Sequence, residues 1–147
     1  MRRIGLAVVL TVSVLASFAA EAQPQPGKVY KIGVIGNTGP AADVSGPNPR
    51  NQNVAALLRG LREFGYEYGR DFVTESRSAE GSPERSIAIA AEFARLNLDV
   101  IVAASPTLFA IKRAGIATPV VMVGTTIDPV ESGFITSLAH PGATSPG

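Results

Sequence analysis

The chain has 147 residues, with 13 Lys and Arg residues against 12 Asp and Glu, and a formal net charge of +1 at pH 7. This balance argues against a nucleic-acid-binding surface and against a polybasic membrane patch. The sequence has no cysteine and one histidine, which excludes disulfides and thiolate chemistry and leaves little for a transition-metal site.

The first 22 residues have the three-part layout of a secretory signal peptide. Arg2 and Arg3 give a positive start, residues 4–20 are apolar and uncharged, and small residues flank Glu21 where a signal peptidase cleaves. We expect cleavage after Ala22, and therefore an exported protein. The alternative is a membrane helix that stays in place, although an apolar run of about 17 residues is at the short limit for spanning a bilayer.

The next part of the chain predicts a strand followed by a helix. Residues 23–28 are rich in Pro and Gln and predict a flexible tether. Residues 29–35 form a β-branched run, which predicts a strand buried on both faces. A loop over residues 36–50 leads to an amphipathic helix over residues 51–66. Its buried face is predicted to consist of Val54, Leu57, Leu58, Leu61 and Phe64.

Two further strand–helix units follow. Residues 72–75, or slightly more, predict the second strand, and Ser82 then caps a helix that has Pro83 in its first turn. Residues 100–104 predict the third strand, and a third helix begins at Ser105. The inner face of the second helix is predicted as Ile87, Ala90, Ala91, Ala94 and Leu98, and that of the third helix as Leu108, Phe109 and Ile111.

The last unit completes the pattern. Residues 119–123 predict a fourth strand, and residues 128–131 have the acidic cap, proline and glutamate of a helix start. We expect this fourth helix to end near Ala139. The order βαβαβαβα predicts a parallel sheet covered on both faces. With right-handed crossovers, the fold is a three-layer, doubly wound α/β sandwich. We expect the flavodoxin-like strand order, one of the common orders of such sheets.

In such a sheet, ligands bind beyond the carboxyl ends of the strands, where the strand order reverses. Four segments rich in glycine and small hydroxyl residues reach this edge, namely residues 36–38, 77–80, 104–107 and 124–128. Two of them lead into predicted helix starts, where free amides and the helix dipole favour an anion. These amides are expected at Thr107, Leu108, Val130 and Glu131. The alternative is that Ser105 and Asp128 only cap their own helices.

Enzyme motifs are not found. Gly33, Gly36 and Gly39 are spaced Gly-x-x-Gly-x-x-Gly, which is not the spacing of a dinucleotide loop, and Pro40 follows. His140 lies after a predicted helix end and before a proline, which favours a surface or hinge residue over a catalytic base. We therefore predict that the protein is not an enzyme and that it has no catalytic residue, metal or cofactor.

Several ordered motifs run along the chain, at residues 30–35, 58–66, 79–85, 90–96, 98–103, 128–130 and 137–142. Together they resemble the substrate-binding proteins of ABC transporters, of the tryptophan/tyrosine type. The resemblance covers nearly all of residues 29–142. It implies a two-lobed protein of the type I periplasmic-binding class, which closes on a small solute between its lobes and then docks on a permease in the inner membrane.

By this resemblance, residues 29–142 are the N-terminal lobe and residues 143–147 a truncated tail, so that the chain is about half as long as the family. The family's ligand-contacting regions carry over onto Asn37, Ser105, Pro106, Thr107, Thr126 and Asp128. The resemblance implies that Ser105 and Thr107 bind a carboxylate and that Asn37 and Thr126 orient the solute. The solute is then an amino acid or a related carboxylate.

The expected partners are thus a small-molecule solute and an ABC transporter permease, without nucleic acid. A single lobe exposes the edge that meets the other lobe, from which we expect self-association. Two alternatives stay open: an exported flavodoxin-like enzyme or cofactor-binding domain that is complete in itself, and a non-functional remnant that folds poorly.

Overall fold

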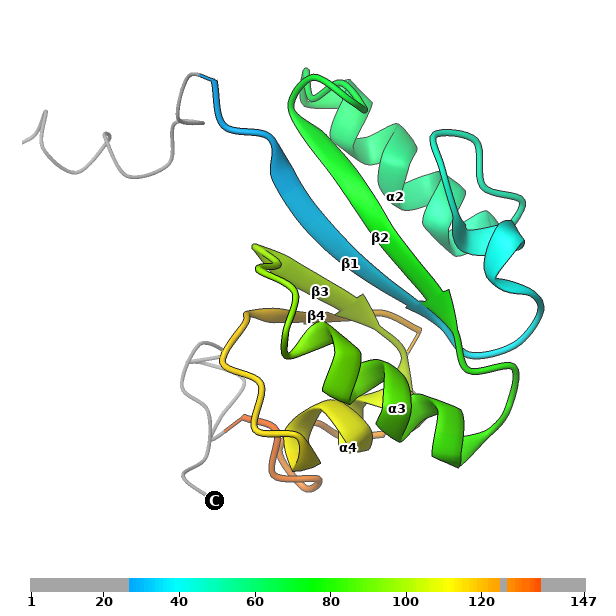
Figure 1. Cartoon of the computed structure of the whole chain (residues 1–147), viewed down its shortest axis with the longest axis vertical. Helices are drawn as coiled ribbons and strands as arrows, with labels where there is room; N and C mark the ends of the chain where they lie inside the picture. Colours follow the sequence, from blue (N-terminus) through cyan, green and yellow to red (C-terminus); the bar gives the residue numbers. More distant parts are fainter. Residues whose placement is uncertain (1–26, 125–126, 136–147) are drawn as a thin grey trace, which may run out of the picture.

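The computed structural model describes residues 27–124 and 127–135, which form a four-stranded parallel sheet with helices on both faces (Figure 1). The strands are β1 (Tyr30–Gly36), β2 (Phe72–Ser78), β3 (Val100–Ala103) and β4 (Val120–Met122). Their order in the sheet is β2-β1-β3-β4, and every neighbouring pair is parallel. The predicted doubly wound α/β fold is confirmed. The expected signal peptide, residues 1–22, lies outside the described residues.

The helices divide between the two faces as right-handed crossovers require. The short 3-10 helix η1 (Ala41–Val44) and α2 (Gln52–Glu63) cover one face of the sheet, whereas α3 (Pro83–Phe93) and α4 (Ser105–Arg113) pack side by side on the other (Figure 1). No helix among the described residues is long and apolar enough to cross a membrane.

Each face of the sheet has its own apolar core. The core on the α2 side consists of Ile32, Val34, Val44, Val54, Leu58, Phe72 and Val102. The core on the other side consists of Ile35, Ala79, Ile89, Ala90, Phe93, Leu98, Ile101, Ala103, Leu108, Ala110 and Ile111. Strand β1 contributes to both because alternate residues of a strand point to opposite faces. This explains why its sequence is apolar throughout.

Helix α2 begins one residue later and ends three residues earlier than the predicted range of residues 51–66. The Asn51 side chain caps it by accepting hydrogen bonds from the amides of Asn53 and Val54 at 3.1 and 3.2 Å. Its buried face carries Val54 and Leu58, as expected. The prediction for Phe64 is wrong, since this residue is the C-cap and is 84% exposed. The chain leaves the helical path there, immediately before Gly65.

The inner face of α3 also differs from the prediction. Ser82 caps the helix, as expected, by accepting a hydrogen bond from the amide of Arg85 at 3.2 Å. The buried residues of α3 are Ser86, Ile89, Ala90 and Phe93. Of the predicted stripe, Ile87, Ala91 and Ala94 are exposed, because the helix is rotated so that the Phe93 ring is inside. In α4, Phe109 is half exposed and its ring lies 5.2 Å from that of Phe134.

The predicted fourth helix is not formed over residues 128–135, which make turns instead. The Phe134 amide donates to the Pro129 carbonyl at 2.8 Å, and Gly133 has a positive φ of 67° that ends any helical path. The Lys112 ammonium of α4 donates to the Gly133 carbonyl at 2.7 Å. This segment is therefore attached to α4. The remainder of the predicted helix, residues 136–139, lies outside the described residues.

Two serines of β2 offer a matched pair of stability tests. The hydroxyl of Ser76 is buried and has no hydrogen-bond partner in the part of the chain that the structure describes, whereas that of Ser78 donates to the Gly39 carbonyl at 2.6 Å. We expect Ser76→Ala to raise the free energy of unfolding by about 1 kcal/mol, because an unsatisfied buried hydroxyl is costly. Ser78→Ala is expected to lower it by about 1 kcal/mol. Urea denaturation measures both, and a loss of stability in Ser76→Ala would show that its hydroxyl is satisfied by water.

Candidate functional site

The candidate site is the edge of the sheet where the strands end. The strand order reverses between β1 and β3, and the loops that follow these two strands leave at the same edge (Figure 1). Ile35 of β1 is paired with Ala103 of β3. Asn37 and Ser105 each follow this pair by two residues, so both predicted site residues lie just beyond the carboxyl ends of neighbouring strands. Such a reversal point is where open α/β sheets bind their ligands.

Backbone hydrogen bonds join the loop after β1 to the loop after β2. The Ala79 amide donates to the Gly36 carbonyl at 2.9 Å, and the Gly81 amide donates to the Asn37 carbonyl at 2.7 Å. These bonds fix the backbone of Asn37, whose residue is half-buried. These two hydrogen bonds therefore hold the loops after β2 and β1 together as one fixed backbone segment at this edge.

The start of α4 differs from the expectation of open amides. The amides of Thr107 and Leu108 both donate to the Ala104 carbonyl, at 3.1 and 3.3 Å, so the prediction that they are free is wrong. Thr107 is fully buried and its hydroxyl also donates to the Ala104 carbonyl, at 2.8 Å. Pro106 is exposed and Ser105 is half-buried, so these two residues form the accessible part of the turn.

The last predicted part of the site is the turn that begins at Asp128. Its carboxylate accepts hydrogen bonds from the amides of Val130 and Glu131 at 2.7 and 3.1 Å. These amides are therefore occupied by the protein's own acid, as the capping alternative predicted, and are not available to an external anion. Thr126 lies outside the described residues.

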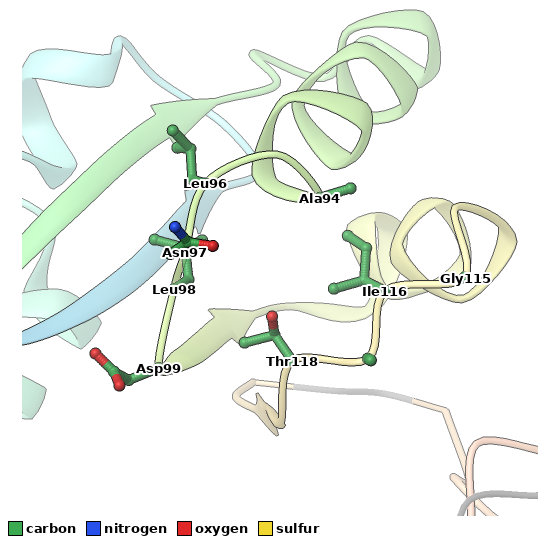
Figure 2. A pocket seen from close by; sticks show the side chains of 9 residues that line it. Ala94, Leu96, Asn97, Leu98, Asp99, Gly115, Ile116 and Thr118 are labelled. Atoms are coloured by element: carbon green, nitrogen blue, oxygen red, sulfur yellow. The ribbon is translucent and has the colours of Figure 1, made fainter.

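A depression of about 470 Å³ lies at the opposite edge, between the loops that precede β3 and β4 (Figure 2). Leu96, Asp99 and Ile116 are among its lining residues. Hydrogen bonds from the Lys28 ammonium and from the Lys31 amide lower the pKa of Asp99. This carboxylate is thus ionised and already engaged within the protein. Nothing in the sequence indicated this depression, which is lined by residues of two ordinary connecting loops.

The sequence profile of the family described as "ABC transporter substrate binding protein" matches residues 41–147. The chain belongs to this family. No curated protein sequence matches it. Among solved structures, the substrate-binding fold of this chain is similar to a conserved domain protein from Vibrio cholerae, with 32% identity and a TM-score of 0.63 over 78% of this chain and 36% of that one.

Two other solved structures support the same fold. A substrate-binding protein with adhesive properties from Clostridium difficile, in its ligand-free, open form, is 25% identical with a TM-score of 0.61, over 75% of this chain and 35% of that one. An ABC domain from Streptococcus pneumonia in complex with L-Trp is 21% identical with a TM-score of 0.60, over 76% and 35%. The chain therefore spans about a third of the length of the solved structures that it matches.

Proposed function

We propose that this chain is the solute-binding component of an ABC transporter, exported to the periplasm, and that it binds an amino acid or a related carboxylate for delivery to an inner-membrane permease. Membership of the substrate-binding family supports the class of function. The observation that supports the site is the register of β1 and β3, in which Ile35 and Ala103 are paired two residues before Asn37 and Ser105. No step of this function requires catalysis or a cofactor.

Within this proposal, Ser105 and Pro106 lie at the start of α4, where the positive end of the helix dipole favours the solute carboxylate. Asn37 supplies an orienting hydrogen bond from the neighbouring strand, and Thr126 and Asp128 are proposed to lie at the same rim. Thr107 has a supporting role in this scheme, because its buried hydroxyl fixes the turn at Ala104. A second lobe closing over this edge would shift the population toward the liganded state.

An NMR titration of the purified ¹⁵N-labelled protein with L-tryptophan tests the proposal. We expect Ser105→Ala to weaken binding about tenfold or more, because a hydrogen bond to a charged group contributes about 1.5–3 kcal/mol. The matched control is Thr118→Ala, which removes a hydroxyl at the opposite edge, in the depression of Figure 2. If Thr118→Ala weakens binding and Ser105→Ala does not, the solute binds at the wrong edge for this proposal. The same titration with FMN tests the flavodoxin-like alternative.

A further inference from the structure

Glu80 has a backbone conformation that its residue type rarely adopts. Its φ is +49°, and it is the one non-glycine residue with a positive φ in the part of the chain that is described. Side chains with a Cβ avoid this left-handed region, in which Asn, Asp and His are the usual exceptions. Such outliers persist where surrounding contacts enforce them, and they are concentrated at ligand-binding segments.

Glu80 and Gly81 are the central residues of a turn that the Ser82 amide closes by donating to the Ala79 carbonyl at 2.9 Å, and further contacts come from the candidate site. The residues on both sides of Glu80 donate their amides to the loop after β1, Ala79 to Gly36 and Gly81 to Asn37. The Glu80 amide donates to the Ser78 hydroxyl at 3.3 Å, and that hydroxyl donates to Gly39. Glu80 is therefore held at the carboxyl edge, in the hydrogen-bonded segment that spans β2 and β1, where its neighbour Gly81 donates to Asn37.

Among the residues that the structure describes, the carboxylate of Glu80 has one charged partner, which is itself exposed. The Arg85 guanidinium, in the first turn of α3, donates to it at 2.5 Å. The two side chains are 53% exposed for Arg85 and 41% exposed for Glu80. Ion pairs in contact with solvent contribute little to stability. A cation arriving at this edge can therefore replace Arg85 on the carboxylate at small cost.

We propose that Glu80 binds an ammonium group of the solute, and that Arg85 occupies the Glu80 carboxylate while the site is empty. The inference rests on the proposed function, because the ammonium group belongs to the same solute whose carboxylate is proposed to bind at this edge. The positive end of α4 at Ser105 takes the carboxylate, and Glu80, across β1, takes the ammonium. The preferred solute class is then zwitterionic, an amino acid in preference to a simple carboxylic acid.

The test uses three matched probes in NMR titrations of the purified protein: L-tryptophan, 3-indolepropionate, which lacks the ammonium, and tryptamine, which lacks the carboxylate. We expect the unmodified protein to bind L-tryptophan about tenfold more tightly than 3-indolepropionate. In E80Q this preference is expected to disappear through weaker binding of L-tryptophan. R85Q is expected to bind L-tryptophan and tryptamine severalfold more tightly, because the competing guanidinium is gone.

The opposite signs of E80Q and R85Q separate this role from a structural one, in which loss of either partner of the ion pair would have the same effect. E80G provides a further control, since glycine relieves the backbone strain; it is expected to melt at an unchanged or higher temperature and still to lose the preference. A preference for L-tryptophan that survives in E80Q would overturn the inference alone. Failure of all three probes to bind the unmodified protein would overturn the proposed function and the inference with it.

Discussion

Replacing Phe93 with alanine is expected to lower the free energy of unfolding by about 3–5 kcal/mol, the usual cost of deleting a buried phenylalanine. Phe93 is the last residue of α3 and is fully buried. Its ring lies against Gly33 in β1 and belongs to the core that α3 and α4 form with the sheet. Because interiors are close-packed, alanine would leave a cavity that neighbouring strands fill only in part. Urea denaturation followed by circular dichroism measures the change.

The matched control is Phe64→Ala, which makes the same chemical change in an exposed residue at the end of α2. We expect this variant to remain within about 0.5 kcal/mol of the unmodified protein, as surface substitutions usually do. Since small domains are stable by only about 5–15 kcal/mol, the Phe93 loss removes a large share of the total. Equal losses in the two variants would contradict the burial that separates them.

The contrast between Phe93 and Phe64 shows which features of the fold can be predicted from the sequence and which cannot. The alternation of apolar runs and capped helices predicted every described strand, and the handedness of crossovers then predicted helices on both faces of the sheet. The inner face of α3 was not predictable in the same way, because the Ile and Ala residues between Ser86 and Ala94 lie on several sides of the helix. Only packing against the sheet decides that Phe93 rather than Ile87 points inward. Phe64 was misplaced because the helix ends one residue before the apolar pattern does.

The candidate site, like the fold, could be predicted only in part from the sequence. Its edge followed from the parallel sheet, and Asn37 and Ser105 lie at this edge, two residues beyond the paired Ile35 and Ala103. The state of individual amides depended on local hydrogen bonds, such as those that Thr107 and Leu108 make to Ala104. The helix propensities of the residues do not predict these hydrogen bonds. The conformation of Glu80 was equally hidden, because the sequence Ala-Glu-Gly indicates a turn without showing that Glu80 takes a positive φ as well as Gly81.

Gly33→Ala is expected to lower the free energy of unfolding by about 1–3 kcal/mol, the typical cost of inserting a methyl group into a packed core. An added Cβ would lie 2.8 Å from Leu98 Cδ1 and 2.8 Å from Phe93 Cε2, both in buried residues. The backbone of Gly33 is not in the left-handed region, so the effect reports packing alone. The close approach of α3 explains why a glycine occupies this position in β1. Gly33 is also the first residue of the Gly-x-x-Gly-x-x-Gly motif, which superficially resembles a nucleotide loop.

The double variant Gly33→Ala, Phe93→Ala identifies the cause. In the Phe93→Ala background, the added methyl group enters the space that the ring has left, and Leu98 gains room to move. We therefore expect the cost of Gly33→Ala to fall by at least half, which would appear as a coupling energy between the two positions in a double-mutant cycle. If Gly33→Ala costs the same in both backgrounds, the two substitutions are independent. The contact between β1 and the end of α3 would then not be what requires glycine at this position.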